Sequence, residues 1–232
     1  MKLSAIILAR VLGYVEAIDL NPRGTLFYPE FTQEFVKQYQ FQKFPQTIEE
    51  FDESKGVEFH QGKCGDKIIQ KFVIWNTILV IETRSSTAEA KQILEEMLSW
   101  GSHKFGLAYK PGMIKRFAYV SDLTFFSDVP LFSFNPAVTQ LAAKTSKAVS
   151  EIWQEPVQYE PLGIGVGHDP LARKYSIAAF SISHRVESKF TENKYFSEAP
   201  LPTDKHIALL EEFEAGMKAL RDTNAHGVAE RR

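Results

Sequence analysis

Residues 68–104 read IIQKFVIWNTILVIETRSSTAEAKQILEEMLSWGSHK, a sequence in which two extended runs precede one amphipathic helix. The runs at 68–75 and 78–83 are dense in β-branched and aromatic residues, which favour strands. Asn76-Thr77 lies between the two runs and suits a tight turn. We therefore predict a β-hairpin that is followed by a helix over residues 86–104.

The start of this helix carries a second local signal. Ser86 is followed three positions later by Glu89, which is the spacing of a capping box. The apolar residues that follow recur at i, i+3, i+4 and i+7, so they share one helix face. This stripe consists of Ala90, Ile93, Leu94, Met97 and Leu98. It is the predicted core face of the helix.

Comparable patterns extend to both sides of the segment. Further helices are predicted over residues 29–41, 135–152 and 203–220 because apolar residues recur there at helical spacing. The helix over 135–152 begins with Asn135 as N-cap and Pro136 at its first position. Its apolar stripe is Val138, Leu141, Ala142, Thr145, Val149 and Ile152. Strands are predicted at 6–18, 57–60, 117–126, 163–167, 175–183 and 190–196.

The order of these elements repeats along the chain. Residues 1–110 and 111–221 each contain a strand, a helix, three strands and a second helix. We interpret this order as two tandem βαβββα-like halves, which predicts an α+β fold with antiparallel or mixed sheet and helices packed on one face. The two halves are expected to form one compact unit. Residues 222–232 are polar and lack periodicity, so they are predicted to be a disordered tail.

Composition limits the function classes that fit the chain. Among 232 residues, 27 Lys and Arg stand against 29 Asp and Glu, so the near-neutral charge argues against general nucleic-acid binding. Cys64 is the sole cysteine, which excludes an intramolecular disulfide and a multi-cysteine zinc site. No apolar run reaches the length of about 20 residues that a membrane-spanning helix needs. We therefore expect a soluble, cytoplasmic protein.

Two glycine-rich stretches depart from known phosphate-binding loops. Between Gly56 and Gly62 lie five residues rather than four, and Cys64 stands where a P-loop needs Ser or Thr. The stretch from Gly163 to Gly167 has the pattern GxGxG, and no helix is predicted directly after it. The sequence thus predicts no nucleotide cofactor.

One acidic pair allows an alternative, catalytic interpretation. Asp66 precedes one strand of the hairpin, and Glu82 with Arg84 lies at the end of the next strand. This spacing resembles that of metal-dependent nucleases, in which carboxylates bind Mg²⁺ and a lysine positions the attacking water. Arg84 stands at the lysine position and cannot replace it as a base. The simpler interpretation is that these residues are exposed at a strand end.

Four residues are candidates for metal ligands. His60 and Cys64 are four positions apart near a predicted turn, and His168-Asp169 occupies the corresponding point of the second half. A zinc site needs three or four ligands, so both turns would have to meet. The sequence matches no known ligand spacing, and we predict no metal.

The aromatic content is unusual, with 18 Phe, 8 Tyr and 3 Trp. Aromatic residues are enriched at protein interfaces, whereas a Phe-rich core is the alternative explanation. The candidates for an interface are Phe125, Phe126, Tyr195 and Phe196. Successive strand residues point to opposite faces, so one of Phe125 and Phe126 is expected in the core.

Together these patterns favour a function without catalysis. We expect an oligomeric protein-interaction or assembly module that binds a protein partner or itself through an aromatic-rich surface. The alternatives are a metal-dependent hydrolase that uses Asp66 and Glu82, and a sensor that binds a small ligand between the two halves.

Overall fold

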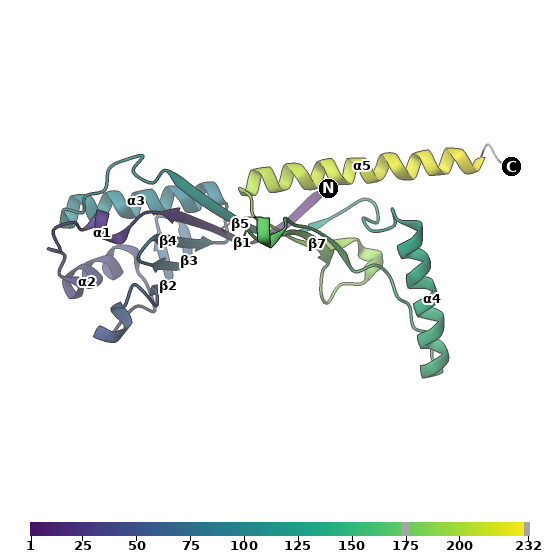
Figure 1. Ribbon diagram of the computed structural model, residues 1–232, viewed down its shortest axis with the longest axis horizontal. Helices are drawn as coiled ribbons and strands as arrows, with labels where there is room; N and C mark the ends of the chain where they lie inside the picture. The colour runs from purple at the N-terminus through teal and green to yellow at the C-terminus, as the bar shows by residue number, and fades with distance from the viewer. Residues whose placement is uncertain (173–176, 230–232) are drawn as a thin grey trace. The chain divides into compact units, whose positions relative to one another are not determined.

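The computed structural model describes residues 1–172 and 177–229 and has an α+β fold (Figure 1). The predicted α+β class with antiparallel sheet is confirmed, because five helices accompany an eight-stranded antiparallel sheet in the described residues, whereas the two tandem halves stay a prediction. The helices are α1 (Ala17–Leu20), α2 (Tyr28–Tyr39), α3 (Thr87–Phe105), α4 (Pro136–Trp153) and α5 (Thr203–Ala229). The strands are β1 (Lys2–Tyr14), β2 (Val57–Cys64), β3 (Lys67–Ile74), β4 (Ile78–Thr83), β5 (Arg116–Phe126), β6 (Gly163–Val166), β7 (Phe180–His184) and β8 (Lys194–Ala199). Short 3₁₀ segments are η1 (Ile48–Phe51), η2 (Pro170–Ala172) and η3 (Phe190–Glu192).

The strands follow the order β2-β3-β4-β1-β5-β8-β7-β6 in the sheet. In the first four strands, β1 pairs with the last strand of the β2-β3-β4 meander. The last four strands have the same arrangement, with β5 beside the last strand of the β6-β7-β8 meander. The chain therefore passes twice through the order strand, helix, three strands, helix, apart from the additional short α1 and the 3₁₀ segments.

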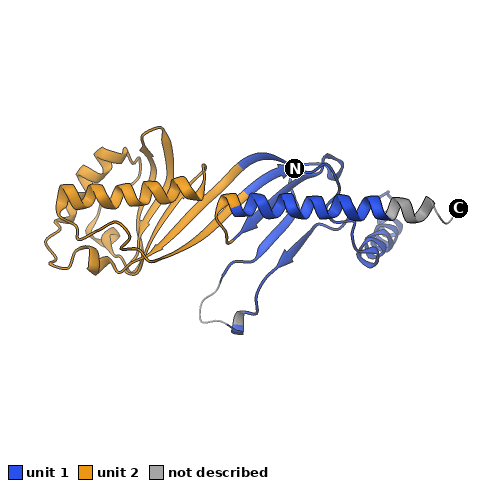
Figure 2. Ribbon diagram, turned by 90° about the horizontal axis from the view of Figure 1, so that it is seen from above, with its two compact units in different colours: residues 1–5, 123–199, 205–232 blue, residues 6–122, 200–204 orange. Residues whose placement is uncertain are grey.

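Two compact units make up the chain (Figure 2). Unit 2 contains residues 6–122 and 200–204, and unit 1 contains residues 1–5, 123–199 and 205–232. The predicted division at residues 110 and 111 and the predicted disorder of 222–232 stay predictions. Within that tail α5 extends to Ala229, and residues 230–232 lie outside the described part of the chain. The predicted strand over 175–183 also begins in an undescribed stretch, residues 173–176, and β7 starts later at Phe180.

Unit 2 has one face of its sheet covered by α2 and α3. The side chains of β4 show this arrangement. Leu79 and Ile81 are buried on the side of the sheet that faces the helices, while Glu82 points to the other side. Alternation of this kind buries one side of each strand and leaves the other side to charged residues. The core between sheet and helices is rich in aromatic rings: Phe31, Phe35, Tyr39, Phe41, Phe59 and Phe72.

Helix α3 follows the sequence prediction closely. Ser86 is its N-cap, and the hydroxyl of Ser86 accepts a hydrogen bond of 3.1 Å from the backbone N–H of Glu89. The predicted stripe is buried throughout, with Leu94 fully inaccessible to solvent. The helix ends at Gly106, whose left-handed conformation (φ 71°) suits glycine.

Unit 1 has a smaller core. Its buried apolar residues come from the end of β5, from β7 and β8, from the loop after β5, and from α5: Leu123, Phe125, Val129, Leu131, Phe132, Ile182, Tyr195, Ala199, Leu210 and Met217. Helix α4 contributes none of them, although the sequence predicts an amphipathic helix there. Among the described residues, no helix combines the length and apolar character needed to cross a membrane.

Candidate functional site

The four aromatic residues proposed from sequence do not share one surface. Phe125 and Tyr195 are fully buried, and their rings lie 5.6 Å apart in the core of unit 1. Phe126 is 36% exposed, and Phe196 is half-buried with Arg185 over its ring. Strand alternation accounts for this split, because adjacent residues of one strand point to opposite faces. Only Phe126 and Phe196 are therefore available to a partner.

The aromatic residues of the first half fill the core of unit 2. Phe35 is 2% exposed and packs within 5.6 Å of Phe41, Phe59 and Phe72, measured between ring centroids. The alternative explanation of a Phe-rich core therefore holds for this part of the chain. The aromatic excess does not by itself mark an interface there.

Glu82 and Asp66 have separate surroundings. Glu82 accepts a hydrogen bond of 2.7 Å from Nε of Arg10 on the neighbouring strand β1, and the two residues are direct cross-strand partners. Asp66 is exposed in the turn between β2 and β3, and Arg84 is exposed beyond the end of β4. The ion pair with Arg10 across the two strands accounts for the presence of Glu82 without a catalytic role.

His60 and Cys64 point to opposite faces of the sheet. Gln61 lies between them with a positive φ of 54°, and the burial pattern of β2 shifts by one position there. His60 contacts Glu58 at 2.9 Å, whereas the Cys64 thiol donates a hydrogen bond to Glu96 of α3. Burial and the Glu96 carboxylate raise the pKa of Cys64 to about 12, so the thiol is a poor nucleophile and a poor ligand.

Both ring nitrogens of His168 form hydrogen bonds with backbone groups. Its Nδ1–H donates to the carbonyl of Asp169 at 3.0 Å, and its Nε2 accepts from the N–H of Ile177 at 3.2 Å. A metal ligand needs a free nitrogen lone pair. Within the described residues, no three His, Cys, Asp or Glu side chains gather in a group that could hold a metal ion.

The sequence patterns do not predict one buried pair, which Ser197 and His206 form. The hydroxyl oxygen of Ser197 lies 2.8 Å from Nε2 of His206, and neither residue is exposed. Ser197 donates its only proton to the carbonyl of Ser181 at 2.7 Å. It therefore accepts a hydrogen bond from Nε2–H of His206, which is opposite to the arrangement of a nucleophile and its base. The pair is structural in this arrangement.

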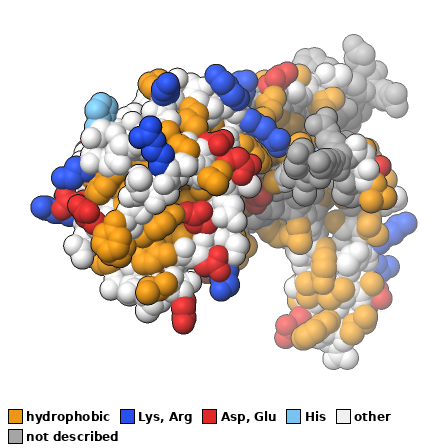
Figure 3. Space-filling view, turned by 60° about the vertical axis from the view of Figure 1, so that its left-hand side comes forward, with side chains coloured by type: hydrophobic (Ala, Val, Ile, Leu, Met, Phe, Trp, Pro, Cys, Tyr) orange, Lys and Arg blue, Asp and Glu red, His pale blue; other side chains and the backbone are white. Residues whose placement is uncertain are grey.

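Helix α4 carries several exposed apolar side chains of unit 1 on one helix. All 18 residues of α4 are described, and none of them is buried. Val138 is 41%, Leu141 65% and Ile152 77% exposed, and these belong to the predicted apolar stripe. Figure 1 shows α4 standing apart from β7, and Figure 3 shows hydrophobic side chains on the lobe that α4 forms at its lower right.

The segment after α4 covers one flank of this stripe. Ser146 accepts a hydrogen bond from the N–H of Tyr159, and Ser150 accepts one from the N–H of Val157, each at 2.8 Å. Both serines lie beside the stripe rather than on it. These bonds hold residues 157–159 along the helix and leave Leu141 and Ile152 uncovered. We call Val138, Leu141, Val149 and Ile152 the α4 stripe from here on.

Unit 1 also has a hollow of about 300 Å³ beside the turn between β7 and β8. His184 and Tyr195, which are cross-strand partners, line it together with Phe132 and Phe190. Burial lowers the pKa of His184, although Glu160 at the rim acts in the opposite direction. The described residues that line the hollow include none from α4.

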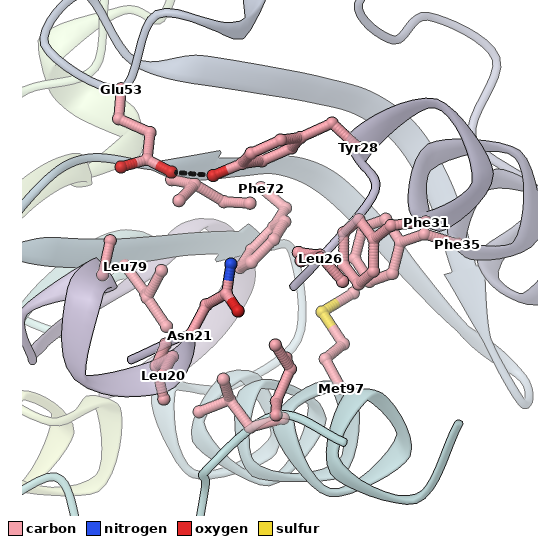
Figure 4. Close-up of a pocket in the computed structure, with 14 residues that line it drawn as sticks. Leu20, Asn21, Leu26, Tyr28, Phe31, Phe35, Glu53, Phe72, Leu79 and Met97 are labelled. Atoms are coloured by element: carbon pink, nitrogen blue, oxygen red, sulfur yellow. Dashed lines mark hydrogen bonds between the residues drawn. The ribbon is translucent and has the colours of Figure 1, made fainter. Parts of the chain in front are cut away.

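Unit 2 has a hollow at the corresponding place, beside the turn between β3 and β4 (Figure 4). The cross-strand partners Ile74 and Leu79 line it. Here α2 closes the space with Phe31 and Phe35, and the remaining cavity is about 70 Å³. The same region of the fold is thus covered by the first long helix in unit 2 and not covered by α4 in unit 1.

No protein-family model matches the chain, and no curated protein matches it.

Proposed function

We propose that the protein is a non-catalytic assembly module that pairs with a second copy of itself through α4. In this pairing, the α4 stripe of one copy covers the hollow of unit 1 in the other copy. Exchange of an identical element between protomers needs no new partner surface, because each copy brings both the helix and the site. The proposal keeps the interaction function expected from sequence and moves its surface from aromatic strand residues to α4.

The observation that carries the proposal is the contrast between α2 and α4. Helix α2 buries four residues, Phe31, Thr32, Phe35 and Tyr39, against its own unit. Helix α4 is six residues longer, 18 against 12, and buries none. An amphipathic helix gains most of its stability from packing its apolar face. An uncovered stripe of this length is typical of an interaction surface.

The hollow of unit 1 supports a second copy as the occupant. Phe132 and Phe190 contribute aromatic rings to its lining, and Tyr195, which also lines it, is fully buried. In unit 2 the equivalent space receives the apolar face of a helix. An apolar helix face is therefore the chemistry that fits the hollow of unit 1, and α4 is the described helix of the chain that has such a face free.

The experiment compares two single substitutions on α4. Leu141→Asp places a charge in the α4 stripe, whereas Ala143→Asp places the same charge on the opposite side of the helix. Size-exclusion chromatography with light scattering is expected to give a dimer for the wild type and for Ala143→Asp. Leu141→Asp should weaken the dimer by roughly a hundredfold or more, because the aspartate would be buried without a partner. A monomeric wild type, or equal masses for the two variants, would contradict the proposal.

We also propose that the tandem halves arose by duplication of one βαβββα unit. Support comes from the equal element order, from the matching strand orders of the two halves, and from the matching hollows beside the β3-β4 and β7-β8 turns. Superposition of residues 1–110 on 111–221 should match all six elements in order. A different handedness of the connections in the second half would overturn this. The cytoplasmic location expected from the cysteine content stays a prediction.

A further inference from the structure

The cavity of unit 2 is apolar inside and opens to a polar depression. Most of its lining comes from side chains of α2, α3 and the sheet, including Phe31, Phe72, Leu79 and Met97 (Figure 4). A void that core residues do not fill forgoes dispersion contacts on every side. An apolar group of a ligand would restore those contacts.

The depression lies directly outside the cavity and has a volume of about 500 Å³. Five residues line both spaces: Ala17, Asn21, Leu26, Tyr28 and Glu53. The two spaces are therefore neighbours that share one boundary. A molecule with an apolar end and a polar head could occupy both.

The charge at this boundary is negative. Glu16 and Glu53 line the depression, and none of its nine described lining residues is basic. Figure 3 shows acidic side chains next to hydrophobic ones on the face of unit 2 that it presents. Glu53 is half-buried, and within the described part of the chain it has no cationic partner. An unpaired carboxylate beside an apolar cavity favours a cationic head group.

The Tyr28 hydroxyl is hydrogen-bonded to one oxygen of the Glu53 carboxylate. The Tyr28 hydroxyl donates a hydrogen bond of 2.5 Å to Oε1 of Glu53, and Figure 4 shows the two side chains meeting at the edge of the cavity. The residues come from different segments, since Tyr28 begins α2 and Glu53 follows η1. Phe51 of η1 packs against the Tyr28 ring at 5.9 Å between centroids. The bond thus joins the two segments across the opening.

We propose that this cavity and its acidic mouth form a binding site for a small amphipathic ammonium ion. The apolar chain of the ion enters the cavity between Phe31 and Leu79, and its ammonium group donates a hydrogen bond to Glu53. Tyr28 then yields one position on the carboxylate. The site lies wholly within unit 2 and does not rest on the proposed pairing through α4.

Isothermal titration calorimetry of the full chain with n-hexylammonium, n-hexanol and hexanoate tests the charge preference. We expect n-hexylammonium to bind about tenfold more tightly than n-hexanol, because a charged donor forms the stronger hydrogen bond. Hexanoate should not bind, because the two glutamates repel it. Equal binding of hexanoate and n-hexylammonium, or binding of none of the three probes, would overturn the proposal.

Four variants locate the site. Glu53→Gln retains an acceptor for Tyr28 and should lower the n-hexylammonium affinity about tenfold, whereas Glu49→Gln, an exposed change outside the cavity lining, should not. Tyr28→Phe should raise the affinity, because the phenol no longer competes for Glu53. Leu26→Trp enlarges a half-buried residue at the shared boundary and should abolish binding of all probes. Circular dichroism checks that each variant folds, and unchanged binding by folded Glu53→Gln and Leu26→Trp would overturn the assignment.

Discussion

Thr87 and Thr203 exchange a pair of reciprocal hydrogen bonds. The backbone N–H of Thr87 donates to the hydroxyl of Thr203 at 3.0 Å, and the N–H of Thr203 donates to the hydroxyl of Thr87 at 2.8 Å. Each residue is the first of its helix, α3 or α5, and each is buried. Each threonine hydroxyl thus accepts a hydrogen bond from a backbone N–H at the start of the other helix, where that N–H has no partner within its own helix.

Replacing either threonine by valine should destabilise unit 2. Thr87→Val keeps the shape of the side chain but leaves the N–H of Thr203 buried without an acceptor, which costs about 1–3 kcal/mol. Thr87→Ser keeps the hydroxyl and should cost less. Urea unfolding at neutral pH measures both variants. Equal stabilities for Thr87→Val and the wild type would show that the pair contributes nothing.

The α3 core face gives a second stability prediction. Ser86→Ala removes the N-cap and should cost about 0.5–2 kcal/mol. Leu94→Ala opens a cavity at a fully buried position and should cost about 2–5 kcal/mol. Denaturant melts of the two variants give the comparison. If Leu94→Ala melts like the wild type, the assignment of this helix face to the core is wrong.

The lowered pKa of Glu214 predicts that the protein loses stability in acid. Burial raises the pKa of its carboxyl, but hydrogen bonds from the Met1 ammonium group, Ser127, the N–H of Asp128 and Lys218 outweigh burial and lower the pKa to about 2. The unfolded carboxyl has a pKa of 4.5, so the folded state holds its proton less tightly. This contribution is therefore present above pH 4.5 and is lost as the pH falls from 4.5 towards 2.

A pKa difference of this size corresponds to roughly 3 kcal/mol. Glu214→Gln should lower the free energy of unfolding at pH 7 and remove part of the decline between pH 4.5 and 2. Thermal unfolding across this range measures the effect. The same slope in Glu214→Gln and in the wild type would assign the decline to other carboxyl groups.

Glu82→Gln tests the catalytic alternative. The substitution breaks the pair with Arg10, whose side chain is 37% exposed, so the expected cost in unfolding free energy is about 0–1 kcal/mol. Self-association of the folded variant should equal that of the wild type. Loss of the native activity in a folded Glu82→Gln protein with intact self-association would favour the metal-dependent hydrolase instead.

Much of the fold follows from local sequence patterns. The hairpin of β3 and β4 and the helix α3 are found within one residue of their predicted bounds. β-Branched runs, a two-residue turn and a cap are local features, and each acts on the chain within a few residues. Their positions therefore need no knowledge of the tertiary structure.

The parts that sequence patterns missed depend on long-range packing. The stripe of α4 predicts an apolar face, but whether the same chain covers that face depends on residues far away. The left-handed conformation of Gln61 moves Cys64 to the face opposite His60, and no residue type marks that change. The hydrogen bond between Tyr28 and Glu53 joins two segments that are 25 residues apart in sequence. Their pairing has no local signal at all.

Cross-linking between mixed copies tests the proposed pairing most directly. In a Cys64→Ser background, one copy carries Ile152→Cys on α4 and the other carries Thr191→Cys at the exposed rim of the hollow. A short bismaleimide should join the two copies only when both are present. Lys37→Cys, an exposed position on α2, replaces Ile152→Cys in the control and should give no product with Thr191→Cys. A covalent mixed dimer specific to Ile152→Cys and Thr191→Cys is the predicted result, and no product above the level of the control would contradict the pairing through α4.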